Sequence, residues 1–412
     1  MKILVITHYY LPEVGAPQRR WSALIRRWQA AGHQVTVCCP GPHYPAVEAT
    51  SNLRDGRRTV MKVETGQFGE QIIRVPYILH GYSGWIRLVD QAIVAAGSVG
   101  ASLFLKARGQ QFDVMVATVP GVPTLFAGVA LQKLLGLPLV VEMRDAWPDV
   151  ITSVKRKNRV LELVSKKIFA PSVKAMQQRA DLLVSATESF AAVLRDRGLA
   201  PVETISNGTT ARSDLAAVAP LAGREGEPLK VLYMGTIGRS QGLYEVVKAV
   251  LKARQMAPDA QIQLRIVGEG ADKPKLQEYV QAHDLPVEFL PLQPREKVAE
   301  HYEWADATLV SLKENPAFEW TVPSKLFELL SVPRLVIGLV AGEAAHILDQ
   351  SGAGIRVNPG DSRELARVLV ELAQDRSRLA VGQRGREFAL KNFNFDELAE
   401  RYLELLAGLA RR

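Results

Sequence analysis

Short runs of apolar residues alternate along the chain with longer stretches in which apolar positions recur at helical spacing. The first apolar run, Lys2–Ile6, is typical of a buried parallel strand. A loop containing Gly15 follows, and then a helical pattern from Gln18 to Ala31 that Gly32 ends. A strand, a glycine-containing loop and a helix in this order indicate the first unit of a doubly wound sheet.

The alternation continues in two series of predicted strands. The first series adds Val35–Cys38, Thr59–Val63, Gln71–Val75, Asp113–Ala117, Leu139–Glu142, Asp181–Ser185 and Val202–Ile205. The second contains Leu229–Met234, Gln261–Val267, Val287–Leu290, Ala307–Val310, Leu335–Ile337 and Gly354–Val357. The clearest helical patterns are Trp85–Lys106, Val122–Leu135, Glu188–Arg197, Asp361–Gln374, Arg378–Asn392 and Phe395–Leu409.

Between the two series, residues 209–228 have no periodicity and contain two prolines. We therefore predict an α/β protein with two tandem Rossmann-like doubly wound domains that face each other across a cleft. The domains are expected at 1–208 and 229–392, with a linker at 209–228 and a C-terminal helix at 393–412.

Composition is consistent with two soluble domains, because the chain has 412 residues, of which 47% are hydrophobic and 23% charged. The only cysteines, Cys38 and Cys39, are adjacent, which fits a reducing compartment and argues against a metal site. The first apolar run is too short for a signal peptide. The most apolar stretch, Trp85–Leu105, is interrupted early by Arg87 and Asp90, so no membrane span is expected.

The net charge of +8 implies an anionic partner, such as nucleotide phosphates or acidic lipid headgroups. A nucleic-acid partner is not expected, because the chain contains no nucleic-acid-binding motif. The helix from Gln18 carries Arg19 and Arg20, with Trp21 and Trp28 seven positions apart. Either the tryptophans pack in a core and the arginines are solvated, or the helix presents a basic and aromatic surface to an anionic membrane. A further basic group, which favours the membrane interpretation, comprises Lys155, Arg156, Lys157, Arg159, Lys166, Lys167 and Lys174.

Residues suited to a phosphorylated ligand occur in the second half of the chain. Pro323 and Ser324 begin a short helix on which Lys325 and Glu328 share one face. A cation for phosphates beside a carboxylate for sugar hydroxyls describes a nucleotide-sugar pocket. The alternative is an ordinary capped helix with a surface ion pair.

Two glycine-rich turns follow neighbouring predicted strands in the same half. In the first, Gly235 and Gly238 are expected to free backbone N–H groups for a diphosphate, with Arg239 as a charged donor. The second contains Gly268. Because carboxyl ends of parallel strands share one edge of a sheet, we expect both turns to converge with Lys325 on one rim.

A charged cluster follows the strand Leu139–Glu142 in the first half. Asp145 can act as a base or as an electrostatic stabiliser, and Arg144 can hold a phosphate or an acidic acceptor. The alternative for this pair is an ion pair that caps the next helix. Trp147 begins a Trp-Pro turn that either contacts an acceptor or is a packed turn.

Together these motifs resemble the retaining GT-B glycosyltransferases of family 4, over nearly the whole chain. Residues 144–148 and 322–325 are similar to the branch that makes bacterial O-antigen, capsule and colanic acid. The resemblance implies transfer of a sugar from a UDP- or GDP-linked donor with retained anomeric configuration and without a metal. It also implies a donor-binding C-terminal domain, an acceptor-binding N-terminal domain, and a last helix that crosses back to the N-terminal domain.

The resemblance also assigns roles to individual residues. Glu328 matches the second glutamate of the family's spaced pair, which contacts ribose. Segment 235–242 matches the diphosphate loop, 290–295, including Leu292, matches the nucleobase loop, and Gly15 matches the glycine loop that faces the donor phosphates.

Several positions depart from the family pattern. The usual arginine and lysine of the diphosphate loop are Thr236 and Gln241, so Arg239 and Lys325 are expected to replace them. The first glutamate of the pair falls at Trp320, one position after Glu319. Glu319 and Ser324 are therefore candidate contacts to the donor sugar. Arg144 stands where the family has a histidine, so the identity of a base is open.

We predict a cytoplasmic glycosyltransferase at the inner face of the cell membrane, with a UDP-sugar donor and N-acetylamino sugars among the candidates. Its expected acceptor is a lipid-linked sugar in surface polysaccharide biosynthesis, with acceptor or membrane contacts at Arg19, Arg20 and Trp147. No cofactor or metal is expected. Alternatives are a non-catalytic GT-B partner of a polysaccharide assembly complex and a GT-B UDP-sugar epimerase.

Overall fold

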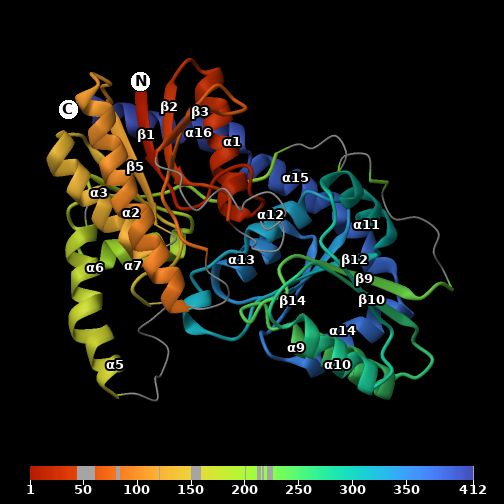
Figure 1. Ribbon diagram of the computed structural model, residues 1–412. Coiled ribbons are helices and arrows are strands. Elements are labelled where there is room, and N and C mark those ends of the chain that lie inside the picture. The colour runs from red at the N-terminus through yellow and green to blue at the C-terminus, as the bar shows by residue number, and fades with distance from the viewer. Residues whose placement is uncertain are drawn as a thin grey trace. The chain divides into compact units, whose positions relative to one another are not determined.

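The computed structural model describes residues 1–43, 61–79, 84–119, 121–149, 159–199, 201–210, 215, 218–219 and 226–411. The chain forms two compact units (Figure 1). Unit 1 comprises Met1–Asn207 together with Phe395–Arg412, and unit 2 comprises Gly208–Asn394. The unit boundary at Asn207 lies within one residue of the predicted end of the first domain. The basic residues of 155–157 lie outside the described residues.

Unit 1 is built on an eight-stranded sheet with strand order β3-β4-β2-β1-β5-β6-β7-β8. Its strands are β1 (Lys2–Ile6), β2 (Gln34–Pro40), β3 (Lys62–Thr65), β4 (Gln71–Val75), β5 (Val114–Val119), β6 (Leu139–Met143), β7 (Leu182–Ser185) and β8 (Val202–Thr204). All pairings are parallel except that of the edge strand β3 with β4. The central strands β5 and β6 are buried at every position and are largely apolar, because helices cover both faces of a doubly wound sheet.

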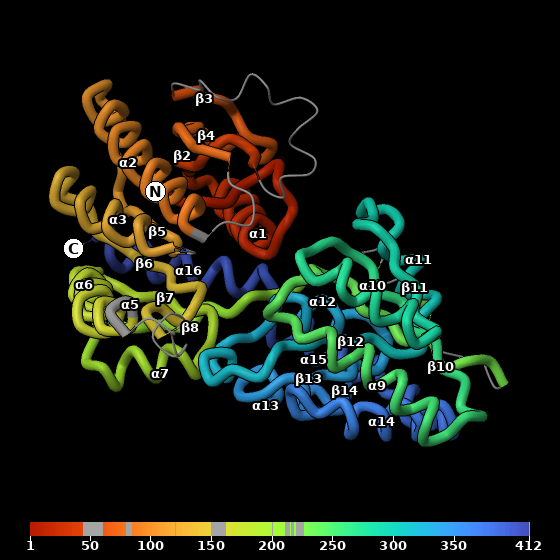
Figure 2. The backbone as a smooth tube through the Cα atoms, turned by 60° about the horizontal axis from the view of Figure 1, so that its bottom comes forward, coloured from red at the N-terminus to blue at the C-terminus, as the bar shows by residue number. Residues whose placement is uncertain are grey.

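The helices of unit 1 include one from the far end of the chain. They are α1 (Ala16–Ala30), α2 (Gly84–Ala107), α3 (Val122–Leu135), α5 (Arg159–Val164), the π-helical turn η2 (Ser165–Phe169), α6 (Ala170–Gln177), α7 (Glu188–Asp196) and α16 (Phe395–Ala410). Figure 2 shows α16, in blue, among the elements of unit 1. Trp21, Trp28 and Tyr402 join α1 and α16 in one core, and Trp28 Nε1 donates to Ala399 O over 3.2 Å. Both tryptophans are fully buried, so the core interpretation is confirmed and these rings form no membrane surface.

Arg20 was expected among acceptor or membrane contacts, and this expectation is wrong because the side chain is buried. Its guanidinium pairs with Glu142 of β6 at 3.1 Å, and both side chains are at most 1% exposed. The remaining N–H groups donate to Ile205 O and Ser206 O. A buried charge is tolerated only when it is paired and hydrogen-bonded, and Arg20 meets both conditions. The pair therefore joins α1, β6 and the end of the first segment of unit 1.

The long helix α2 differs from expectation in one respect. By length and composition Trp85–Ala107 could cross a membrane, with 44% of its most apolar window buried. Asp90 lies within the apolar stretch, but one or two charged residues do not exclude a helix of this length and composition. The helix packs against α3 in unit 1. The same test is passed by core helices of soluble proteins.

Unit 2 is built on six parallel strands in the order β11-β10-β9-β12-β13-β14. The strands are β9 (Leu229–Met234), β10 (Ile262–Val267), β11 (Val287–Leu290), β12 (Ala307–Ser311), β13 (Leu335–Leu339) and β14 (Gly354–Val357). The helices are α9 (Leu243–Met256), α10 (Lys273–Ala282), α11 (Val298–Trp304), α12 (Ser324–Leu330), α13 (Gly342–Ser351), α14 (Ser362–Gln374) and α15 (Gly382–Asn392), with short 3₁₀ turns η3 (Arg295–Lys297), η4 (Pro316–Phe318) and η5 (Ser377–Val381).

Two local features of unit 2 differ from the sequence-based expectation. Leu215 and Val218, from the segment predicted as a linker, are buried in the core of unit 2. The single helix predicted at 378–392 is divided into η5 and α15. Gly382 lies at this junction, where an added Cβ would stand 2.3 Å from the backbone nitrogen of Arg334. Close packing of backbone on backbone therefore fixes the division.

The buried Arg20–Glu142 pair yields a stability prediction. Glu142→Gln should lower the free energy of unfolding of unit 1 by about 3 kcal/mol, because it leaves the guanidinium charge buried without a counter-charge. Chemical denaturation measures this loss. The matched control is Glu203→Gln, which removes an exposed partner of Arg401 and should cost at most about 1 kcal/mol. Equal losses in the two variants would contradict the structural role of the buried pair.

Candidate functional site

Each sheet has one point at which the strand order reverses direction along the chain. In unit 1 this point lies between β1 and β5, and in unit 2 between β9 and β12. The loops after these strands turn away from each other and leave room at the carboxyl edge, which is where doubly wound sheets bind ligands.

In unit 2, the two predicted glycine turns interlock at this edge. Ile237 N donates to Glu269 O over 2.9 Å, and Asp272 N donates to Ile237 O over 3.1 Å. Gly268 has a φ of +143°, and an added Cβ would lie 1.9 Å from the backbone oxygen of Gly235. Only glycine fits this contact. The two turns therefore converge as expected, and their convergence with Lys325 on one rim stays a prediction.

The expectation that Gly235 and Gly238 leave their N–H groups free is wrong. Gly235 N donates to Val267 O over 3.0 Å, and Gly238 N donates to the side-chain oxygen of Gln241 over 3.2 Å. The next two residues, Arg239 and Ser240, are exposed, and their backbone N–H groups donate to no other described residue. The amides available to an anion are therefore those of Arg239 and Ser240, which follow both predicted glycines.

Lys313 is a cation at this edge that the sequence analysis missed. Its backbone N–H donates to Ser240 O over 2.8 Å, and its side chain is exposed. The available signal was its position two residues after β12, because β12 lies across the reversal point from β9. Arg239 and Lys313 thus follow the two strands that flank the reversal point.

Lys325 and Glu328 share one face of α12, as their spacing predicted. Lys325 Nζ lies 2.8 Å from Glu328 Oε1, which also accepts from the Tyr302 hydroxyl over 2.7 Å. The two side chains are 20% and 14% exposed, so this is a partly buried ion pair. The shared face that the spacing predicted is therefore confirmed as an ion pair.

Three further residues assigned from the sequence lie in loops or at a helix start in unit 2. Leu292 follows β11 and is 51% exposed, which makes it a large apolar side chain open to a flat ring. The side chain of Glu319 is exposed, and its backbone oxygen accepts from Glu343 N over 3.1 Å. Ser324 is the first residue of α12 and is partly buried.

In unit 1, Arg144 and Asp145 follow β6 at the carboxyl edge. The Nη1 atom of Arg144 is buried and has no hydrogen-bond partner among the described residues. Desolvation lowers the pKa of this guanidinium, and the charge of Glu142 acts in the opposite direction. A buried, unsatisfied cationic donor is costly, and an anionic ligand would satisfy it.

The side chain of Asp145 is exposed, yet its surroundings disfavour the charged carboxylate form. The surrounding protein raises the pKa of its carboxyl group by desolvation, against the opposing charges of Arg144 and Arg87. Arg87, on the first turns of α2, donates to the Tyr9 hydroxyl over 3.0 Å. From the sequence, Arg87 was seen only as an interruption of an apolar run. The structure places it as a second cation near Asp145.

The other predicted site residues of unit 1 differ in burial and in backbone conformation. Trp147 is partly buried and packs edge-on against Phe169. Gly15 precedes α1 with an extended φ of −173°, a conformation open to any residue. An added Cβ there would meet only the flexible end of Gln18, so the position does not demand glycine. Arg19 is exposed.

Comparison with known proteins relates both halves of the chain to sugar-transferring enzymes. Residues 15–208 match the family described as "Glycosyl transferase 4-like domain", and residues 228–375 match "Glycosyl transferases group 1". A colanic acid biosynthesis glycosyl transferase of Escherichia coli K12, WcaI, is 25% identical over 81% of each chain.

Two solved structures are similar across the chain. Sucrose-phosphate synthase of Thermosynechococcus elongatus has a TM-score of 0.74 at 18% identity, covering 99% of this chain and 98% of its own. HepE of Anabaena, solved in complex with UDP and glucose, has a TM-score of 0.67 at 15% identity, covering 99% of this chain and 100% of its own. At these identities the likeness establishes the fold.

The raised pKa of Asp145 predicts how stability depends on pH. A carboxyl group whose pKa is higher in the folded state destabilises that state increasingly as pH rises from its ordinary value of 3.8 through the folded pKa. Asp145→Asn should therefore unfold at a higher temperature than the wild type at pH 7, and the difference should shrink toward pH 4.

Thermal unfolding at pH 4 and pH 7 measures this effect. The control is Asp259→Asn, an exposed aspartate of unit 2, which should shift the transition little at either pH. A lower unfolding temperature for Asp145→Asn at pH 7 would show that the carboxylate is stabilised by the folded protein, contrary to the prediction.

Proposed function

The chain belongs to the family 4 type of glycosyltransferases with the GT-B fold, and from this premise we propose that it is a retaining enzyme using a UDP-sugar donor. Its acceptor is a lipid-linked sugar in the biosynthesis of a surface polysaccharide. The observation that carries the proposal is the gathering of cations and unoccupied backbone amides at the reversal point of unit 2.

The donor diphosphate binds at this edge of unit 2. Arg239 and Lys313 supply positive charge on either side of the reversal point, and the amides of Arg239 and Ser240 supply uncharged donors. Lys325 adds a third cation at the start of α12. Support for a UDP-linked donor comes from the similarity to HepE, which was solved with UDP and glucose.

The nucleoside binds beside the diphosphate. Leu292 offers its exposed apolar side chain to the face of the base. Glu328 accepts hydrogen bonds from the ribose hydroxyls, and Tyr302 and Lys325 hold its carboxylate in place. Glu319 and Ser324 contact the donor sugar, for which N-acetylamino sugars are candidates.

The transfer breaks the bond between the anomeric carbon and the phosphate oxygen and forms a bond from that carbon to an acceptor oxygen on the same face. The acceptor hydroxyl passes its proton to the departing phosphate, so the reaction needs neither a metal nor a cofactor. Arg239, Lys313 and Lys325 stabilise the charge that develops on the diphosphate. The protein otherwise acts by holding donor and acceptor in alignment.

Unit 1 binds the acceptor at its own carboxyl edge. The buried Nη1 atom of Arg144 takes an anionic group of the acceptor, because no described residue satisfies it. Asp145 adds a carboxyl group at the same edge, where it accepts a hydrogen bond from the acceptor. Both residues lie on the loop after β6.

The enzyme acts in the cytoplasm at the inner face of the membrane, in peripheral contact with it. Helix α1 offers no aromatic face to a membrane, because Trp21 and Trp28 are buried. Two other groups of exposed apolar residues in unit 1 support the peripheral contact. These are Trp85, Ile86, Leu88 and Val89 on α2, and Leu163, Val164 and Ile168 near the basic Lys166 and Lys167.

A panel of nucleotide sugars tests the proposed donor. UDP-sugars should raise the unfolding temperature, and with acceptor lipid should release UDP, whereas Lys325→Ala and Arg239→Ala should each weaken donor binding by about 2–3 kcal/mol through loss of a charge-assisted hydrogen bond. Lys275→Ala removes an exposed lysine of α10 and serves as the control. Absence of both UDP binding and UDP release would favour a non-catalytic partner instead.

Sedimentation with vesicles tests membrane contact. The protein should co-sediment with vesicles containing anionic lipid at low salt and be released as salt rises, because the attraction of surface lysines is screened. Trp85→Glu and Ile168→Glu should each reduce the bound fraction severalfold. Met256→Glu, at an exposed apolar position in unit 2, should not. Failure to bind anionic vesicles at low salt would remove the membrane proposal and leave the donor proposal intact.

A further inference from the structure

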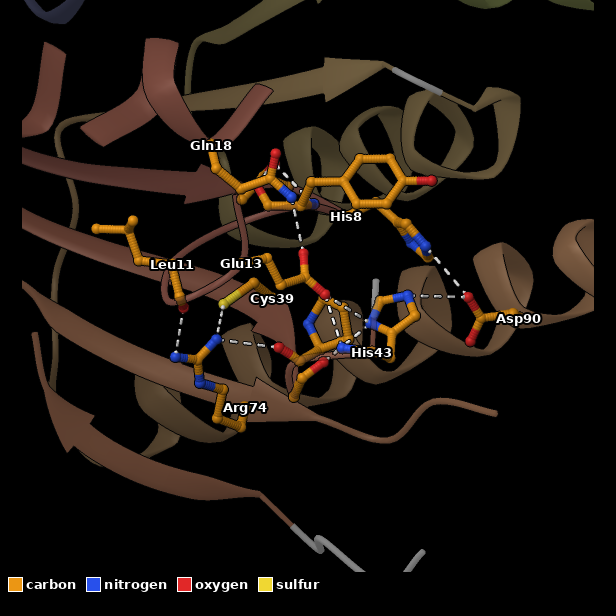
Figure 3. Close-up of polar contacts among 12 residues, drawn as sticks. His8, Leu11, Glu13, Gln18, Cys39, His43, Arg74 and Asp90 are labelled. Carbon is orange, nitrogen blue, oxygen red and sulfur yellow. Dashed lines mark hydrogen bonds and ion pairs between the residues drawn. The ribbon is translucent and has the colours of Figure 1, made fainter. Parts of the chain in front are cut away.

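A buried cluster of histidines and carboxylates lies at the carboxyl edge of the unit 1 sheet. His8 follows β1, His43 follows β2, and Asp90 lies on α2 (Figure 3). His8 Nε2 is 3.1 Å and His43 Nε2 is 3.6 Å from the same oxygen, Oδ2 of Asp90. All three side chains have no exposed surface. The transfer chemistry proposed above uses none of them.

The contacts of His43 fix which of its ring nitrogens carries a proton. Nδ1 lies 2.9 Å from the backbone oxygen of Gly41 and 3.3 Å from Oε1 of Glu13, both of which are acceptors. Nδ1 is therefore the protonated nitrogen, and in a neutral ring Nε2 presents a lone pair toward Asp90. A lone pair that faces a carboxylate in the interior is stabilised by positive charge between the two atoms, supplied by a metal ion or by a second proton on the ring.

Asp90 and His8 also direct potential ligand atoms toward the centre of the cluster. Oδ1 of Asp90 accepts from Ile78 N over 2.9 Å, which leaves Oδ2 directed toward the two rings. Neither ring nitrogen of His8 makes a well-formed hydrogen bond to another described residue, although Nε2 is within ion-pair distance of Asp90. The nitrogen therefore lies close to the carboxylate without pointing an N–H group at it.

We propose that His8 Nε2, His43 Nε2 and Asp90 Oδ2 together bind a divalent transition-metal ion of the zinc type. Two imidazoles and one carboxylate are ordinary ligands for zinc. With bonds of about 2.0–2.1 Å, neighbouring tetrahedral ligand atoms lie roughly 3.3 Å apart. Two of the three separations here are 3.1 and 3.6 Å. The three residues offer ligand atoms that all lie within 4.8 Å of one another, so binding shortens the remaining separation by up to about 1.5 Å through ring rotation.

The groups around the cluster form the outer shell that such a site requires. Glu13 and Gly41 O hold the ring of His43, and Ile78 N holds the carboxylate of Asp90. Partners of this kind fix the tautomer and orientation of metal ligands. The expectation of no metal rested on the scarcity of cysteine, and this ligand set contains none.

The position of the site gives the ion a structural role. It joins the loop after β1, the loop after β2 and the first turns of α2, which also carry Arg87. Metal binding would stabilise this edge of unit 1, because the free energy of binding adds to the free energy of folding. The ion takes no part in bond breaking at the donor diphosphate.

Metal content of the full-length, tag-free protein tests the inference. After gel filtration, elemental analysis should find about one zinc ion per chain, and removal with a chelator should lower the unfolding temperature reversibly. Cobalt(II) added to the stripped protein should give the visible absorption of a four-coordinate site. His8→Gln and Asp90→Asn should each lose most of the metal, and His283→Gln, an exposed histidine of unit 2, should keep it.

The cobalt spectrum of the wild type shows whether the site binds a metal ion, even if the variants fold poorly. Wild-type protein without bound metal and without cobalt absorption would overturn the proposal, and would leave Asp90 between two protonated rings as the explanation. Metal retained at full stoichiometry in His8→Gln or Asp90→Asn would overturn it equally, by placing the ion elsewhere. Neither result bears on donor binding in unit 2.

Discussion

The common direction of the strands is the constraint on which the rest of the structure depends. Every strand of unit 2 and all but the edge strand β3 of unit 1 run parallel, so each strand delivers its following loop to the same edge of its sheet. Several of the candidate functional side chains lie just past strand ends. Arg239 and Lys313 follow β9 and β12, and His8, His43 and Asp145 follow β1, β2 and β6.

The charged residues of unit 1 fall into two groups, one paired with an opposite charge and one disfavoured in its charged form. The Arg20–Glu142 pair is buried and hydrogen-bonded on several sides, as expected for a group that supports the fold. Asp145 and Arg144 are disfavoured in their charged forms, and Arg144 keeps a buried donor without a described partner. Groups left unsatisfied at a strand edge are more often functional than structural, because the folded protein gains nothing from them.

The fold, and much of the carboxyl edge of the unit 2 sheet, could be predicted from the sequence. Runs of apolar residues predicted the strands closely, since a strand buried on both faces is largely apolar, and β9, β11 and β14 have the predicted bounds. The glycine turns were identified correctly because Gly268 meets the backbone of Gly235. Their donor groups were misassigned because the use of an amide depends on neighbours such as Val267 O, which no local pattern reveals.

Other features were hidden because they join residues far apart in the chain. The helical spacing of Trp21 and Trp28 suited either a core or a surface, and only the packing of α16 on α1 decides for the core. Arg20 and Glu142 are separated by 122 positions. The cluster of His8, His43 and Asp90 has no motif in the sequence, since three different elements bring it together.

The central claim is that the reversal point of unit 2 holds a nucleoside diphosphate, and a crystal structure of the protein with UDP tests it most directly. The account predicts the diphosphate at the backbone amides of Arg239 and Ser240, with Lys313 or Lys325 within hydrogen-bond distance, the ribose at Glu328 and the base at Leu292. UDP bound at another edge of the protein, or a diphosphate contacting none of these groups, would contradict it.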